Sequence, residues 1–129
     1  KKVSKQGFHL FPKIRELDRL ARAGCAARLV ESHPEVAFAM LAGGRGLTSP
    51  KKVKNRPNPA GLDERRELLV AHGFARAMLE RPPRGAGPDD LLDACVLALV
   101  ALRVARGEAV SFPDPPGRDE TGLEVAIRA

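Results

Sequence analysis

The residues from Pro88 to Arg106 constrain the fold of this chain more than any other segment. Pro88 and two aspartates stand where a helix would begin, two arginines occupy its last turn, and Gly107 follows it. This is the pattern of a helix with complementary charges at both ends. Its middle, Ala94–Leu102, is apolar on every side, and a helix without a polar face must be buried. The segment therefore predicts a helix that is buried on most sides by neighbouring elements.

A second pattern joins a strand to a helix without an intervening loop. Residues Ala26–Glu31 form a short strand-like run, and Ser32 with Glu35 has the spacing of a capping box that begins a helix. The apolar stripe of this helix ends at Gly43–Gly44. A strand that leads directly into a capped helix is typical of α/β proteins, in which the last side chain of the strand faces a crevice at the sheet's carboxyl edge. That side chain is Glu31.

Hydrophobic spacing and the positions of glycine and proline predict the remaining elements. We expect an amphipathic helix over Pro12–Ala23 ended by Gly24, and Phe8 and Phe11 are also compatible with an earlier start in which Pro12 is a kink. The other expected elements are an extended basic loop over 45–61, helices over Leu62–Ala71 and Phe74–Leu79, a turn-rich linker over Phe112–Thr121 and a final strand over Gly122–Ala129.

This organisation contains two strands that are far apart in the sequence, and two such strands do not form a stable sheet alone. The first residue is Lys1 and not methionine. We therefore expect residues 1–129 to be the C-terminal part of a single α/β domain. Additional strands, from an upstream segment or from a second copy of the chain, are expected to pair beside Arg28–Glu31.

Positive charge is concentrated in the first half of the chain. The formal net charge is +6, and residues 1–56 contain 13 basic and 4 acidic side chains. This asymmetry is compatible with a polyanionic partner, and equally with an Arg-rich composition that has no functional meaning. No apolar run reaches the ~20 residues that a membrane span needs. Cys25 and Cys95 stand far apart without a motif, which is typical of thiols in a reducing compartment. A cytoplasmic protein is expected.

Three carboxylates are candidates for chemistry: Glu31, Asp90 and Asp93. Asp90 and Asp93 share one face in the first turns of the long helix, and Glu31 at the end of its strand could approach the same point. Hard cations such as Mg²⁺ or Mn²⁺ prefer oxygen ligands and catalyse phosphoryl chemistry by stabilising the attacking and leaving oxygens. The alternative is that the aspartates stabilise the positive end of the helix dipole without any metal.

Other polar residues indicate nucleic-acid binding less specifically. Lys51, Lys52 and Lys54 could contact phosphates, or they could belong to a solvated loop. His33 could position a phosphate or a water, or it could be purely structural. The chain contains no Trp and no Tyr, which argues against an aromatic stacking platform for single strands.

Several motifs resemble a known family. Val30-Glu31-Ser32-His33-Pro34-Glu35-Val36, Ser49-Pro50-Lys51-Lys52 and Pro88-Asp89-Asp90-Leu91-Leu92-Asp93-Ala94 are similar to the family called domain of unknown function 429. Its members are predicted nucleases with an RNase H-like fold of the Holliday-junction-resolvase type. Ser4-Lys5-Gln6 and Pro12-Lys13-Ile14-Arg15-Glu16 also resemble the family's lead-in helix, and Gly122-Leu123-Glu124 resembles its terminal strand.

The resemblance implies an RNase H-like mixed sheet flanked by helices, with the N-terminal strands absent from this chain. In that fold a first-strand aspartate, a glutamate that ends the fourth strand and one or two aspartates on the last helix bind metal. By motif, Glu31 takes the fourth-strand position, and Asp90 and Asp93 take the last-helix positions.

The function implied by the resemblance is a metal-dependent nuclease acting on DNA or RNA, with Mg²⁺ or Mn²⁺ as cofactor and nucleic acid as partner. One alternative is a non-catalytic RNase H-like module that binds nucleic acid or a protein partner. Another is a different nucleotide-handling activity, because a fold does not dictate a function. A homodimer is also compatible with the sequence.

Overall fold

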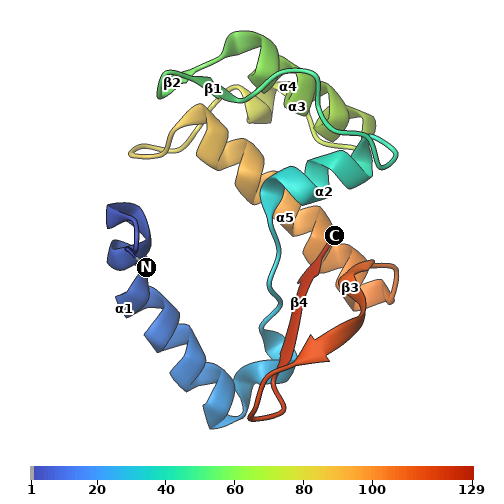
Figure 1. Ribbon diagram of the computed structural model, residues 1–129. Coiled ribbons are helices and arrows are strands. Elements are labelled where there is room, and N and C mark those ends of the chain that lie inside the picture. Colours follow the sequence, from blue (N-terminus) through green and yellow to red (C-terminus); the bar gives the residue numbers. More distant parts are fainter. Residues whose placement is uncertain (1) are drawn as a thin grey trace.

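The computed structural model describes residues 2–129. Its longest helix, α5 (Pro88–Arg106), runs from a group of shorter helices at one end to a β-hairpin at the other (Figure 1). The other helices are α1 (Lys5–Leu20), α2 (Pro34–Leu41), α3 (Pro59–Ala71) and α4 (Arg76–Leu79). The strands are β1 (Lys52–Val53), β2 (Arg56–Pro57), β3 (Ser111–Arg118) and β4 (Glu124–Arg128), and they form two small antiparallel sheets. The described chain is therefore mixed helix and strand. The larger mixed sheet of an RNase H-like domain stays a prediction.

Helix α5 has the bounds that the sequence predicts. At its start the Gly87 N–H donates to Asp90 Oδ2 at 2.7 Å, and after its last turn Gly107 adopts a left-handed φ of 72°. Leu92 is fully buried, whereas Leu102 near the other end is 44% exposed. The expected burial on most sides is thus confirmed only for the first part of the helix, because α2, α3 and α4 pack against that part.

The hydrophobic core lies between α5 and the three helices that pack against it, and we call α2 to α5 the helical part. Phe38 of α2, Leu69 of α3, Leu79 of α4 and Val96 of α5 are each fully buried. The other buried residues of this core are Ala37, Leu62, Leu92, Cys95 and Val100. Burial of each large apolar side chain contributes ~1.5–3 kcal/mol, so the core holds these four helices in one arrangement.

The expected strand Ala26–Glu31 is wrong in its first half. Residues Ala26–Arg28 form a 3₁₀ turn, in which the Leu29 N–H donates to the Ala26 carbonyl. Only the residues after this turn are extended, and the Arg128 N–H of β4 donates to the Glu31 carbonyl at 2.8 Å. The extended segment therefore lies beside β4 but joins it through a single bridge.

The capping box expected from Ser32 and Glu35 is also wrong. Helix α2 has His33 as its N-cap, and no side chain caps it. The Ser32 Oγ instead donates to the carbonyl of Arg128 at 2.7 Å. The Ser32 hydroxyl, which local spacing assigned to the start of the helix, therefore takes part in a contact between distant parts of the chain.

The expected linker Phe112–Thr121 is mostly strand β3. This strand pairs antiparallel with β4, with Phe112 opposite Ile127 and an irregular register before Gly117. Three of its residues are prolines, which cannot donate ladder hydrogen bonds and so favour a turn-rich interpretation. An edge strand tolerates them. The final strand expected over Gly122–Ala129 is confirmed as β4.

Helix α1 begins earlier than the spacing predicts. Ser4 Oγ accepts from the Gly7 N–H at 3.0 Å as its N-cap, and Pro12 lies inside the helix. Helix α1 ends at Leu20 and continues into a π-helical segment, Ala21–Cys25, in which Gly24, with a φ of 97°, breaks the helical path close to the expected position. Near this end the Arg22 side chain pairs with Asp18 and donates to Thr121 Oγ1 of the hairpin at 2.9 Å.

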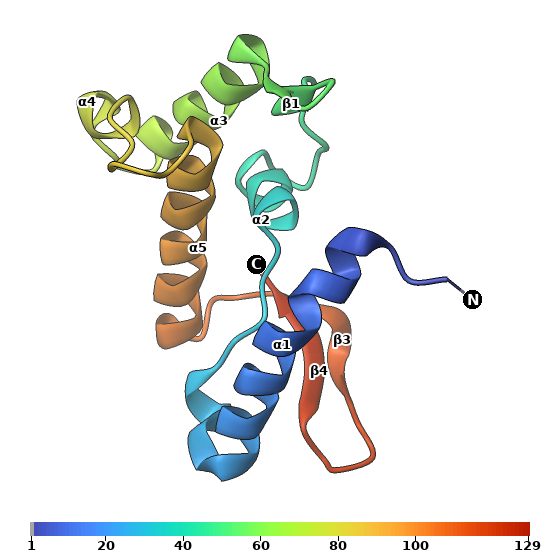
Figure 2. The same ribbon diagram turned by 90° about the vertical axis from the view of Figure 1, so that its left-hand side faces the viewer.

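Helix α1, the extended segment before α2 and the β3–β4 hairpin occupy the lower part of the molecule in Figures 1 and 2. Residues from all three line an open groove of about 1110 Å³. Ile14, Leu17, Leu29, Val30 and Glu31 are among the residues that line it. The large apolar side chains that α1 leaves exposed are Phe8, Leu10, Phe11, Ile14, Leu17 and Leu20. None of the helices described between residues 2 and 129 is long and apolar enough to cross a membrane.

The expected basic loop 45–61 contains the small β1–β2 hairpin. Its turn is made by Lys54 and Asn55, both with a left-handed φ, of 49° and 61°. The base of the hairpin packs on α3, where Gly61 approaches the backbone of Pro50. The position of the loop thus depends on the absence of a side chain at Gly61.

Gly61→Ala is expected to lower the free energy of unfolding, although alanine is the better helix former by about 1 kcal/mol. A Cβ at Gly61 would stand 2.1 Å from the carbonyl oxygen of Pro50, so the loop or the helix would have to move. Gly46→Ala is the matched control, since a Cβ there meets nothing within 4 Å. Urea unfolding measures both variants. A Gly61→Ala protein as stable as the wild type would contradict the close packing.

Candidate functional site at the start of helix α5

The three carboxylates singled out in the sequence occupy two different places. Asp90 and Asp93 lie in the first turns of α5, whereas Glu31 lines the groove beside α1. The Glu31 carboxylate makes no hydrogen bond or ion pair with the side chains or backbone described between residues 2 and 129, and only the backbone carbonyl of this residue is engaged, by the Arg128 N–H. Within that range no three His, Cys, Asp or Glu side chains gather closely enough to hold a metal ion. The expected convergence of Glu31 with Asp90 and Asp93 is therefore not present, because Glu31 sits on the segment that pairs with β4, before α2 begins.

Asp90 has a structural contact of its own. Its Oδ2 accepts the Gly87 N–H at 2.7 Å, which closes the first turn of α5. A carboxylate here also faces the positive end of the helix dipole. This contact is the metal-free role that we considered for the aspartates of this helix.

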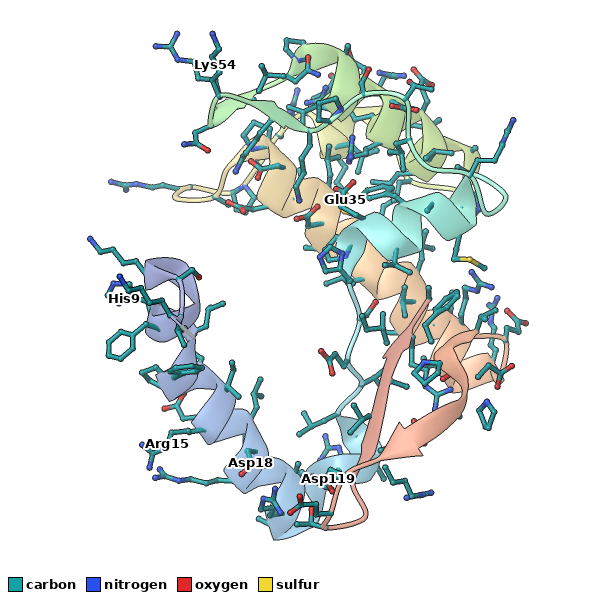
Figure 3. All side chains as sticks on the ribbon, viewed as in Figure 1. His9, Arg15, Asp18, Glu35, Lys54 and Asp119 are labelled. Atoms are coloured by element: carbon teal, nitrogen blue, oxygen red, sulfur yellow. The ribbon has the colours of Figure 1, made fainter. Side chains whose placement is uncertain are left out.

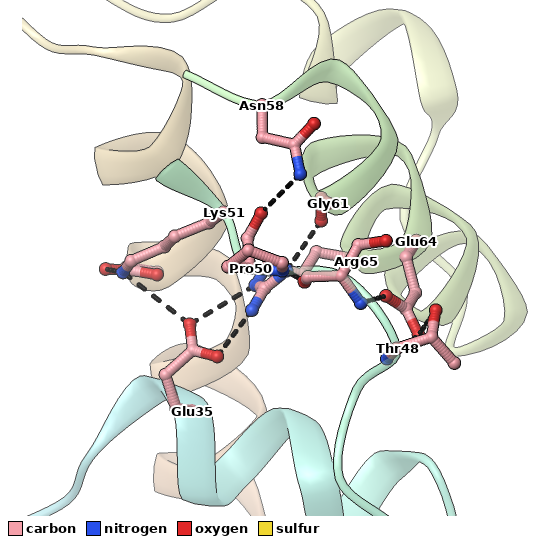
Figure 4. A network of polar contacts seen from close by, with 10 residues as sticks. Glu35, Thr48, Pro50, Lys51, Asn58, Gly61, Glu64 and Arg65 are labelled. Carbon is pink, nitrogen blue, oxygen red and sulfur yellow. Dashed lines mark hydrogen bonds and ion pairs between the residues drawn. The ribbon is translucent and has the colours of Figure 1, made fainter. Parts of the chain in front are cut away.

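Asp93 faces a lysine and a second acid. Its Oδ2 accepts from Lys51 Nζ at 2.5 Å, and the same Nζ lies 3.7 Å from Glu35 Oε1 in the first turn of α2 (Figure 4). Asp93 Oδ1 is buried and has no hydrogen-bond partner among the described residues. Two carboxylates from different helices thus share one ammonium, and one oxygen remains available as an acceptor.

Glu35 is held in place by a buried arginine. Arg65 is only 1% exposed. Its guanidinium pairs with both carboxylate oxygens of Glu35, through Nε and Nη2. It also donates to the carbonyl of Gly61 at 2.6 Å (Figure 4) and to that of Ser49 at 3.1 Å. The guanidinium carbon lies 5.6 Å from the centre of the Phe38 ring. A buried guanidinium is tolerated only when its donors are satisfied in this way.

Glu35 and Arg65 are the polar residues of this region whose structural role the sequence analysis missed. Arg65 stands three positions after Leu62 and four before Leu69, two buried residues of the same helix. A charged residue on the apolar stripe of a helix was the available signal for a buried ion pair. Nothing in local spacing pointed to Glu35 as its partner.

A second acid fixes the loop that carries the lysines. Glu64 accepts from the N–H groups of Thr48, at 2.8 Å, and Ser49, at 3.0 Å, and from the Thr48 hydroxyl. The backbone hydrogen bond from Thr48 is the main reason that the pKa of the Glu64 carboxyl lies below its usual value. The loop before β1 is therefore attached to α3 by charge-assisted hydrogen bonds.

Lys52 pairs with the third acid of the α5 start. Its Nζ lies 2.6 Å from Asp89 Oδ2, and the Asp89 side chain is only 8% exposed. The hydrogen bond from Lys52 lowers the pKa of the Asp89 carboxyl, and the same bond raises the pKa of Lys52. Of the three residues expected to bind nucleic acid, Lys51 and Lys52 thus neutralise acids of α5, and His33 is the exposed N-cap of α2.

The carboxylate pair that the structure brings together is therefore Asp93 with Glu35, at the start of two helices. Mg²⁺ is commonly bound by one or two carboxylates together with waters and substrate phosphates. Asp93 and Glu35, with the unpaired Asp93 Oδ1, have the chemistry to hold such an ion. The same two carboxylates are also adequate counter-ions for Lys51 alone.

Comparison with known proteins gives one finding. A family model described as "Protein of unknown function (DUF429)" matches residues 1–118. Neither a search of curated proteins nor a search of solved structures found a match. The matched span includes the acidic and basic residues of the candidate site.

Lys52→Met is expected to destabilise the protein in a pH-dependent manner. Because Asp89 has a folded-state pKa below its ordinary 3.8, its pair with Lys52 contributes stability above that pH, and the contribution is lost as pH falls through the folded-state pKa. The stability gap between wild type and Lys52→Met should thus be largest near neutral pH and close in acid. Urea unfolding across this range measures it, with Lys54→Met on the same hairpin as control. A gap that does not change with pH would exclude the pair as its cause.

Proposed function

This chain belongs to the DUF429 family of proteins of unknown function, and we propose that it forms part of a divalent-metal-dependent nuclease. The observation that carries the proposal is the acidic start of α5, where Asp93 keeps one buried oxygen unpaired and faces Glu35 across Lys51. Support also comes from the resemblance of the Glu31 and Asp93 motifs to a family of predicted RNase H-like nucleases. The substrate in this proposal is DNA or RNA.

The residues that would hold Mg²⁺ or Mn²⁺ are Asp93 and Glu35. A bound divalent ion would supply stabilisation of the attacking and leaving oxygens of a phosphodiester. The chain's own contribution is to fix the two carboxylates: Arg65 orients Glu35, and Lys51 holds Asp93. Glu31 lines the groove beside α1. It would become a further ligand only if the segment before α2 took a different position.

A specific observation favours a second function, a non-catalytic module that binds nucleic acid or a protein. Lys51 and Lys52 already neutralise Asp93 and Asp89, so these acids have a complete structural role without a metal. On this alternative the carboxylates hold the basic loop in place and carry out no chemistry.

Asp93→Asn separates the two functions because it preserves shape and removes one charge. On the nuclease proposal, Mn²⁺ raises the melting temperature of the wild type by binding the folded state, an effect of about 2.7 kcal/mol at a hundredfold excess over Kd. The variant should lose that metal response together with any Mn²⁺-dependent cleavage of DNA or RNA. Melting curves with and without Mn²⁺, and a nuclease assay, measure the outcome.

The matched control is Asp63→Asn, which removes an exposed acid of α3 whose one ion pair among the described residues is with Arg66. It should retain the metal response of the wild type. Equal Mn²⁺ shifts in wild type and Asp93→Asn would exclude Asp93 as a ligand. No shift in the wild type would favour the non-catalytic module.

A further inference from the structure

We infer that the β1–β2 hairpin is the surface that contacts the backbone of a nucleic-acid duplex, through Lys54 and Arg56. Lys51 and Lys52, in contrast, serve inside the protein as counter-ions. The inference rests on the proposed function for its partner class, nucleic acid. It goes beyond that proposal by assigning the contact to particular side chains and to a double-stranded form.

The cations of the basic loop fall into two groups, those paired with acids and those that face solvent. Lys51 is committed to Asp93 and Glu35, and Lys52 to Asp89, at ion-pair distances of 2.5, 3.7 and 2.6 Å. Lys54 and Arg56 are exposed and form no ion pair or side-chain hydrogen bond with the described residues. Lys54 points away from the body of the molecule (Figure 3). The charge of this loop that is available to a partner therefore lies at the turn.

The β1–β2 hairpin that carries these exposed cations is held rigidly at its base. Two-residue strands are not stable alone, but here the Asn58 N–H donates to the Lys51 carbonyl at 2.9 Å, and Asn58 Nδ2 donates to the Pro50 carbonyl at 2.8 Å. Gly61 lets this base pack directly on α3. The hairpin is thus fixed to the helical part, and a pre-ordered cationic element loses little entropy when it binds.

The exposed cations of the hairpin are suited to the phosphate backbone of a duplex. Positively charged side chains on a fixed element are suited to phosphate oxygens, which position a protein on nucleic acid without reading sequence. The hairpin, residues 52–57, contains no aromatic side chain on which an unpaired base could stack, so a single strand lacks its usual platform. A two-stranded ribbon is also an element that the major groove of a duplex admits.

The test is the salt dependence of binding to a short fluorescent DNA duplex, measured by anisotropy. Each phosphate contact contributes about 0.9 to the slope of log K against log salt concentration. Lys54→Gln/Arg56→Gln removes two such contacts, so it should reduce the magnitude of the slope by about 1.8 and make binding less salt-dependent. It should leave the melting temperature unchanged. The matched control is Lys13→Gln/Arg15→Gln, which removes two exposed cations of α1 and should keep the wild-type slope. Lys51→Gln/Lys52→Gln should lower the melting temperature and keep the slope.

The outcomes also separate this inference from the proposed function. If the wild type binds or cleaves duplex DNA but the Lys54/Arg56 variant retains the full slope, the hairpin assignment is overturned and the nuclease proposal stands. A slope that falls only in the Lys51/Lys52 variant overturns the division of cations. If the wild type binds no duplex, the hairpin inference fails, and if it also cleaves neither DNA nor RNA with Mn²⁺, the nuclease proposal fails as well. Hairpin-dependent binding to phosphatidylserine vesicles without duplex binding would overturn the partner class.

Discussion

The guanidinium of Arg65 is buried in the helical part and satisfies its donors with groups from separate segments of the chain. It pairs with Glu35 of α2 and donates to the carbonyls of Ser49, in the loop before β1, and Gly61, in the first turns of α3. Because the guanidinium is buried, loss of its carboxylate partner would leave an uncompensated charge inside the protein, which is strongly destabilising. The placement of α2 against α3, and the path of the loop between them, therefore depend on this one side chain.

The path of that loop decides which charges meet. Lys51 and Lys52 reach Asp93 and Asp89 because the loop is held on α3 by Arg65, by Glu64 and by the close approach at Gly61. Part of the positive charge of the first half of the chain is thus neutralised by acids of the second half. A count of charges cannot separate such internal counter-ions from cations that face solvent, and this distinction determines where a polyanion can bind.

The part of the molecule around α1 is less closed. Helix α1 exposes a row of large apolar side chains, and Leu29 and Val30 beside the groove are exposed as well. Large contiguous apolar surfaces of this kind mark contacts with other elements or molecules. Glu31 lies on this side because the Arg128 N–H of β4 holds its carbonyl, which separates its carboxylate from the acids of α5. Additional strands beside Arg28–Glu31, and with them an RNase H-like sheet, stay a prediction.

The sequence by itself determined the elements whose signals are local. The bounds of α5 followed from Pro88 and Gly107, and the break in the helical path after α1 followed from Gly24, because caps and left-handed positions act over a few neighbouring residues. Tertiary structure decided two pairings between residues far apart: Ser32 with β4 in place of a helix cap, and Lys51 between Asp93 and Glu35. These two contacts join residues 16 to 96 positions apart, whose distance in space is set by the packing of the core and not by their spacing along the chain. Pairing with β4 likewise decided that the proline-containing β3 is a strand, against the turn preference of its prolines.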